Sequence, residues 1–222
     1  MQVNQFKIHP SSCGEIMGAK GLGKTGESYL QNWYKEQIYQ RRNTFQSKYT
    51  DKGNITESDC VDLVAEVLDL GMVVKNEKTL SNEFMVGTPD IITADLVIDV
   101  KSSWSAFSFP LFDTVVPNKD YELQLQCYMA LTGLHRAKLV YCLMDTPDEQ
   151  IQKEAYYHAE RNGLDFDEEF YNEFKKAYLY SHLPHSLRVK SFDIERNDEV
   201  IKAICDRVLL CREYLETIKI KS

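Results

Sequence analysis

The 222-residue sequence predicts an α/β fold in which helices flank a small central mixed β-sheet. Two observations lead to this prediction. Segments with apolar residues at helical spacing alternate along the chain with short runs rich in Val, Ile and Leu, which are typical of strands. The length suits one domain with a sizeable buried core, so we expect residues 1–222 to form a single domain.

The first half of the chain predicts two helices and a β-rich segment. Residues 26–42 are amphipathic, with Leu30 and Ile38 on the apolar face. A second helical pattern opens at Lys52 and places Glu57 in its first turn, where an acid complements the helix dipole. Residues 71–101 hold several short apolar runs, which predict strands.

The second half predicts a helix at 118–133 that ends at Gly133, then a strand at 137–143. An alternating strand at 187–194 and an amphipathic helix at 198–218 close the chain. The acidic segment 147–181 predicts one or two helices, broken at Asn162-Gly163, which would form an accessory helical hairpin.

Residues 104–117 form an aromatic connection between predicted strand and helix. Core packing is the favoured role for its side chains. A subunit contact and a wedge against DNA are the alternatives. Six cysteines at 13, 60, 127, 142, 205 and 211 form no CxxC pair, which argues against a zinc site. Cys127 and Cys142 lie in apolar segments and are expected in the core, in a reduced protein.

No apolar run approaches the length of a membrane span, and the first residues do not form a signal peptide. We therefore expect a cytoplasmic protein without a membrane partner. The loop Gly18-x4-Gly23-Lys24-Thr25 matches the Walker A pattern. A Walker A loop needs a buried strand before it, and a helix start precedes this one, so we reject nucleotide binding.

The most informative stretch is Gly87-Thr-Pro-Asp90, followed nine residues later by Asp99-Val100-Lys101 after a short apolar run. On a strand, Asp99 and Lys101 share one face and Val100 takes the other. Two carboxylates and an ammonium that converge suit a divalent cation and a water attacking a phosphate. Asp90, Asp99 and the Val100 carbonyl would be hard oxygen ligands, and Lys101 would orient the water or stabilise phosphate charge. Taken separately, the Pro-Asp turn and Asp-x-Lys would be ordinary surface features.

This stretch resembles the core motif of the PD-(D/E)xK nucleases, with Asp as the middle acid. That resemblance implies a restriction-endonuclease-like core. Upstream, Gly53-x3-Glu57 is similar to the form found in relatives of phage lambda exonuclease, where a helical Glu helps to hold the metals. Glu57 could instead be only a favourable first-turn residue.

Downstream, Tyr121-x2-Gln124 and Tyr128 lie on one helical face. They resemble the third motif of the lambda-exonuclease (YqaJ-like viral recombinase) family. The resemblance places Gln124 near the attacking water or the phosphate and Tyr121 on the DNA side or behind the site. A satisfied polar position in the core is the alternative.

At the front, His9-Pro-Ser11-Ser12 is similar to the segment of this family that binds the DNA 5′ phosphate, with His9 in place of an Arg. Ser11 and Ser12 are candidate hydrogen-bond donors to that phosphate. Alternatively, they only cap the next helix. A net charge of −8 argues against a basic coat, so DNA would need a local groove. Candidate contacts lie at Arg41, Arg42, Lys48 and Lys52, although surface Lys and Arg are more often only solvated.

The resemblance implies an exonuclease that needs Mg²⁺, with Mn²⁺ as a substitute, and digests duplex DNA from the 5′ end in phage-type recombination. It also implies a ring-shaped trimer, a single-strand annealing protein as partner and, for a phage-encoded chain, the host cytoplasm. An endonuclease or repair nuclease with the same chemistry is the alternative enzyme. A DNA- or partner-binding protein on a dead nuclease fold is the alternative outside enzymes, and the intact set Glu57, Asp90, Asp99, Lys101 and Gln124 argues against it.

Overall fold

The computed structural model describes residues 5–42 and 48–220, except for the side chains of residues 48–50. Its centre is a four-stranded sheet in the order β3-β4-β5-β6. The strands span Ile91–Ile92, Val97–Ser103, Arg136–Leu143 and Val189–Glu195. β4 and β5 are parallel, whereas the β3–β4 and β5–β6 pairs are antiparallel, which confirms the predicted mixed sheet.

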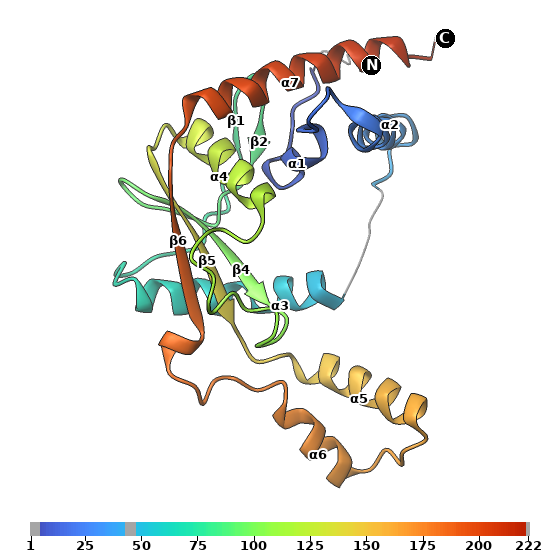
Figure 1. Cartoon of the computed structure of the whole chain (residues 1–222), viewed down its shortest axis with the longest axis vertical. Helices are drawn as coiled ribbons and strands as arrows, with labels where there is room; N and C mark the ends of the chain where they lie inside the picture. The colour runs from blue at the N-terminus through green and yellow to red at the C-terminus, as the bar shows by residue number, and fades with distance from the viewer. Residues whose placement is uncertain (1–4, 43–47, 221–222) are drawn as a thin grey trace.

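Helices cover both faces of the sheet (Figure 1). α4 (Lys119–Thr132) packs Leu125 and Met129 against one face, and its sequence from Gln124 to Met129 is buried throughout. α3 (Lys48–Val67) covers the opposite face, where Val61 and Val64 meet Ile98 and Cys142 of the central strands. Successive residues of β4 therefore point alternately toward α4 and toward α3.

A second layer of helices packs on the far side of α4 from the sheet (Figure 1). It contains a 3₁₀ turn and three helices, together with a two-stranded antiparallel sheet. These elements are η2 (Pro10–Ser12), α1 (Cys13–Ile16), α2 (Gly23–Tyr39), α7 (Asp198–Thr217), β1 (Leu80–Ser81) and β2 (Val86–Gly87). Phe6, Leu30 and Val208 are completely buried there, so the N-terminal segment and α7 share one core.

α5 (Asp148–Asn162) and α6 (Glu168–Lys176) pack against each other and project away from the sheet (Figure 1). Gly163 ends α5 in a left-handed conformation, as the predicted break at Asn162-Gly163 requires. A short 3₁₀ turn, η3 (His185–Leu187), leads from this pair of helices into β6.

Most helices and strands agree with the prediction, but two features differ. Glu57 lies in the middle of α3, because the helix continues from Lys48 through Gly53. Its position in the first turn was therefore a wrong prediction. Residues 72–74 form no strand, and the side chains of Met72 and Val74 are exposed. An apolar run without neighbouring strands to pair with does not form a strand.

The phenylalanines of the aromatic segment 104–117 differ in burial. Phe109 is buried in the core between the sheet and α4, as core packing predicts. Phe107 and Phe112 of the same segment are exposed to solvent. Cys127 and Cys142 are buried, as predicted, and neither is joined in a disulfide.

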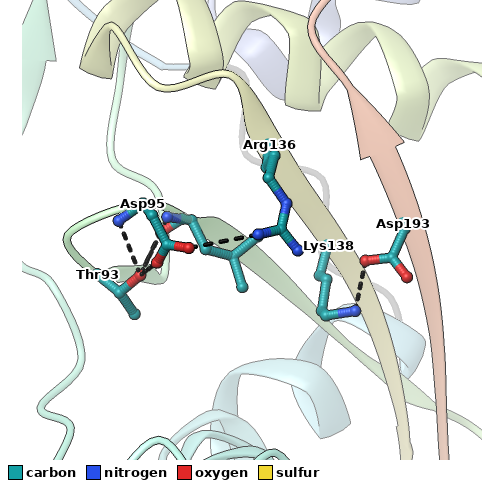
Figure 2. Close-up of polar contacts among 6 residues, drawn as sticks. Thr93, Asp95, Arg136, Lys138 and Asp193 are labelled. Atoms are coloured by element: carbon teal, nitrogen blue, oxygen red, sulfur yellow. Dashed lines mark hydrogen bonds and ion pairs between the residues drawn. The ribbon is translucent and has the colours of Figure 1, made fainter.

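The start of the central strands carries polar contacts at the surface (Figure 2). Thr93 Oγ1 accepts from the backbone N–H of Leu96 at 3.0 Å, which closes the turn between β3 and β4. Asp95 pairs with Arg136 across this turn, and Lys138 of β5 pairs with Asp193, which lies directly opposite on β6. Among the described residues, none of the helices is long and apolar enough to span a bilayer.

Candidate active site

A cavity of about 1080 Å³ opens beside β4 and holds most of the residues singled out in the sequence. Its walls come from β4, α3, α4 and the segment after β4. Asp90 enters from the residue before β3, Asp99 and Lys101 from β4, Glu57 from α3, and Gln124 from α4. The fold therefore brings all five predicted catalytic residues to one cavity.

The alternation of β4 directs Asp99 and Lys101 to the face that α4 covers. Lys101 Nζ lies 2.8 Å from Asp99 Oδ2, and both side chains are largely buried. Asp99 Oδ1 accepts a hydrogen bond from Gln124 Nε2 at 2.9 Å. Asp99 Oδ2 has Lys101 as its ion-pair partner, but no donor among the described residues is aligned to form a hydrogen bond with it.

Gln124 connects the charged pair to the surrounding fold. Its Oε1 accepts from Lys101 Nζ at 3.2 Å, while its Nε2 donates to Asp99 and to the Tyr128 hydroxyl at 3.2 Å. Tyr128 lies one helical turn later and donates to the Thr88 carbonyl at 3.3 Å. A Cβ at Gly87 would lie 2.7 Å from Pro10 and 3.1 Å from the Tyr128 ring, so only glycine permits this close packing.

Asp90 is fixed by the backbone of the strand that carries Asp99. Its Oδ2 accepts from the Val100 N–H at 2.7 Å. Burial and the nearby Asp99 carboxylate raise the pKa of Asp90 to about 7. Burial also raises the pKa of Asp99, although Lys101 opposes that shift. Two carboxylates with raised pKa values form a site that a cation would stabilise.

Lys101 stays charged in this environment. Burial alone would lower the pKa of its ammonium, but the Asp99 and Asp90 carboxylates outweigh burial and raise it. The Nζ atom also lies 4.7 Å from the centre of the Tyr121 ring, which provides a favourable cation–π contact. Tyr121 therefore lines the cavity beside the charged pair, as its position on the face of Gln124 predicts.

Glu57 lies at the same cavity but has a partner of its own, since Lys75 Nζ lies 2.5 Å from its Oε2. Among the described residues, no three Asp, Glu, His or Cys side chains lie together as a ready-made metal centre. Mg²⁺ often needs only one or two protein carboxylates, because waters and substrate phosphates complete its shell. Three oxygen ligands fit that requirement: the Asp90 carboxylate, Asp99 Oδ2, which accepts no hydrogen bond from the described residues, and the Val100 carbonyl.

The predicted DNA contacts are scattered. Ser11 lines the cavity, whereas Ser12 lies outside its described lining, at the N-cap of α1 and without a side-chain capping hydrogen bond. Arg41 and Arg42 are exposed just beyond α2 and lie outside the described lining of the cavity. Lys48 begins α3, but its side chain lies outside the described residues.

Lys52 does not fit the predicted role of a phosphate contact. It is completely buried, and its Nζ donates to the carbonyls of Trp104 at 2.9 Å and Met144 at 2.8 Å. These carbonyls follow the parallel strands β4 and β5 directly. Lys52 therefore ties α3 to the ends of both central strands, and burial lowers its pKa to about 8.

Two residues at the site were not predicted from the sequence. Lys75 pairs with Glu57 from a segment that was expected to be a strand. Phe107 lies at the cavity from the aromatic segment, where core packing was the favoured prediction. No periodic pattern marks either residue, because both lie in irregular segments whose path depends on distant contacts.

Comparison with known proteins relates this fold to exonucleases. A phage-related exonuclease from Haemophilus somnus 129PT is 25% identical, with a TM-score of 0.77 over 96% of this chain and 95% of that one. The alkaline exonuclease LHK-Exo from Laribacter hongkongensis is 15% identical, with a TM-score of 0.66 over 97% of this chain and 90% of that one. No protein-family model matches the chain, and neither does any curated protein. The chain has the fold of these two exonucleases, one of which is phage-related.

Proposed function

We propose that this protein is a Mg²⁺-dependent deoxyribonuclease that digests DNA from its ends. The observation that carries the proposal is the convergence of Asp90, Asp99, Lys101 and Gln124 in one cavity of an exonuclease fold. These groups are those that phosphodiester hydrolysis needs: oxygen ligands for a divalent cation, a fixed positive charge and a hydrogen-bonding amide.

Asp90, Asp99 and the Val100 carbonyl would hold the cation, and Glu57 of α3 lines the same cavity. When bound, Mg²⁺ would lower the pKa of water and neutralise negative charge on the phosphate. Mn²⁺ prefers the same oxygen ligands and would substitute. Glu57 would have to leave Lys75 or share it in order to reach the cation.

Lys101 and Gln124 would act on the water and the phosphate. The raised pKa of Lys101 keeps its ammonium charged at neutral pH, so it would stabilise the charge that develops on the scissile phosphate. Gln124 holds both Lys101 Nζ and Asp99 Oδ1, and so would fix their spacing while the substrate enters. Such preorganisation lowers the reorganisation cost of the transition state.

Digestion would proceed in the 5′→3′ direction on duplex ends and would serve phage-type recombination. The motifs similar to lambda exonuclease support this direction. The Laribacter enzyme, which shares only the fold, has been crystallised in complex with dAMP, a nucleoside monophosphate of the kind that exonucleases release. The same resemblance supports a ring-shaped trimer around DNA and a single-strand annealing protein as partner.

Linear duplex DNA labelled at one end, with and without a 5′ phosphate, tests the activity. We expect release of mononucleotides with Mg²⁺ and none with EDTA, with faster digestion of the 5′-phosphorylated end. Supercoiled plasmid is the control for endonuclease activity, and nicking of the plasmid would favour the alternative enzyme. A purified, folded protein that cleaves neither substrate with Mg²⁺ or Mn²⁺ would contradict the proposal.

Light scattering at micromolar concentration tests the ring. A trimer that continues digestion after an excess of unlabelled trap DNA is added would agree with enclosure of the duplex, since a closed ring repeats one heterologous interface. A monomer that releases DNA after each cleavage would contradict the ring and leave the metal site untouched.

A further inference from the structure

Phe107 has an unusual position, because it is a fully exposed phenylalanine at the catalytic cavity. It occupies the third position of a turn that Ser105 opens and Ser108 closes. The Ser108 N–H donates to the Ser105 carbonyl at 3.1 Å, and Ser108 Oγ accepts from the Ser105 N–H at 3.0 Å. These hydrogen bonds fix the backbone that carries the ring, whereas the ring itself is exposed to solvent.

The rest of this segment is anchored to the core. The Tyr180 hydroxyl accepts from the Ala106 N–H at 3.4 Å, and Phe109 is buried in the core with only 7% of its surface exposed. Phe112 follows at 92% exposure, but it does not line the cavity. One segment thus carries an anchoring Phe, an exposed Phe at the cavity and an exposed Phe away from it.

The side chains that line the cavity carry more negative than positive charge, so Phe107 could contribute affinity for DNA that charge alone does not supply. Among the described residues that line it, three are carboxylates, whereas the only cation is Lys101, which is paired with Asp99. Until a cation binds there, phosphate contacts alone would therefore hold DNA weakly in this cavity. Stacking on an aromatic ring requires no positive charge and accepts any base, because every base has a π-face.

We propose that Phe107 stacks on a nucleobase of the strand whose phosphate enters the cavity. Within a duplex both faces of a base are covered by the neighbouring base pairs, so the base that stacks on this ring belongs to the terminal nucleotide of the strand. This inference rests on the proposed function and deepens it, since it assigns a binding residue for the base beside the proposed metal and phosphate site.

The first test compares substitutions at Phe107 with Phe112→Ala as the matched control. Both side chains are exposed on the same segment, so both truncations should leave the fold intact. Phe107→Ala should raise KM for DNA by roughly 10- to 100-fold, the range for loss of one base stack, with kcat within about threefold. Phe107→Trp should restore KM, Phe107→Leu should not, and Phe112→Ala should match the wild type.

The second test measures stacking without cleavage. DNA with 2-aminopurine at its terminal nucleotide is titrated with the full-length protein in EDTA. The wild-type protein and the Phe107→Trp variant should quench the 2-aminopurine fluorescence, whereas the Phe107→Ala variant should not. Wild-type behaviour of Phe107→Ala, or equal KM values for the Leu and Trp variants, would overturn the inference. If the wild-type protein cleaves DNA, either of these results leaves the proposed function standing. If the wild-type protein neither cleaves nor binds DNA, both the proposed function and this inference are overturned.

Discussion

Two ion pairs on the same sheet use the same kinds of residue in opposite environments. Near the start of β4 and β5, Arg136 and Asp95 lie 3.4 Å apart with 61% and 73% of their side chains exposed (Figure 2). In the middle of β4, Lys101 and Asp99 lie 2.8 Å apart with 23% and 3% exposed. Water screens the first pair, so it contributes about 0–1 kcal/mol to stability.

The second pair has lost most of its water, and desolvation of two charges costs free energy that their attraction regains only in part. The raised pKa values of Asp90 and Asp99 reflect that cost. The exposed pair of Asp95 and Arg136 therefore belongs to an ordinary solvated surface, whereas the buried pair of Asp99 and Lys101 has the desolvation cost and geometry expected of a reactive site. Substitutions at matched positions separate the two roles.

The largest expected effect is at Asp99. Asp99→Asn keeps the side-chain shape and an acceptor for Gln124, but removes a negative charge from the proposed metal site. We expect loss of detectable DNA cleavage with a retained circular dichroism spectrum. Asp193→Asn makes the same chemical change at the exposed pair with Lys138 and should cleave like the wild type. Wild-type rates in Asp99→Asn would remove Asp99 from the mechanism.

The next effect is at Lys101. Lys101→Ala should lower kcat by about 10²–10³-fold, because a preorganised charge acts mainly in the transition state. Binding of DNA in EDTA should change little. Lys138→Ala, on the neighbouring strand, is the matched control and should leave kcat unchanged. If Lys101→Ala weakened binding and left kcat at saturation intact, Lys101 would be a phosphate contact only.

A smaller effect, on stability and not on chemistry, is expected at Lys52. Lys52→Met leaves the carbonyls of Trp104 and Met144 without their donor, which should cost about 1–3 kcal/mol of unfolding free energy. Urea denaturation measures this loss. The dependence of DNA binding on salt should stay unchanged, because the ammonium is buried and neutralises no phosphate. A shallower salt slope would restore Lys52 as a DNA contact.

Lys52 also predicts a pH dependence. Burial lowers its pKa to about 8, although Cys60 and the Asp145 carboxylate oppose that shift. Between about pH 8 and the usual lysine pKa, the unfolded chain binds more protons at this position than the folded protein. The contribution of Lys52 to stability should therefore rise with pH in that window. The difference in unfolding free energy between wild type and Lys52→Met should widen from pH 8 to 10, and a constant difference would contradict the assigned pKa.

The smallest effect is expected at the exposed pair of Asp95 and Arg136. Asp95→Asn should change the free energy of unfolding by about 0.5 kcal/mol or less, since both partners are solvated. Thermal denaturation at low and high salt measures it, and cleavage should be unaffected. A loss of several kcal/mol would mean that this exposed pair stabilises the sheet substantially, which would contradict the difference proposed between it and the pair of Asp99 and Lys101.

The sequence by itself determined how the candidate site residues are oriented within each regular element. The two-residue repeat of a strand places Asp99 and Lys101 on one face, and the helical repeat places Gln124 and Tyr128 together. Gly133 ends α4 in a left-handed conformation, as predicted. These local periodicities follow from backbone geometry and do not depend on what surrounds the element.

Only the tertiary structure decided which side chains are buried and which partners they find. Lys52 was expected to reach DNA but lies beneath the ends of β4 and β5, and Glu57 meets Lys75 from an irregular segment. Phe109 and Phe107 have the same chemistry and are two residues apart, yet one enters the core and the other faces solvent. Outside regular elements no repeat directs a side chain, so contacts with residues far along the chain determine its environment.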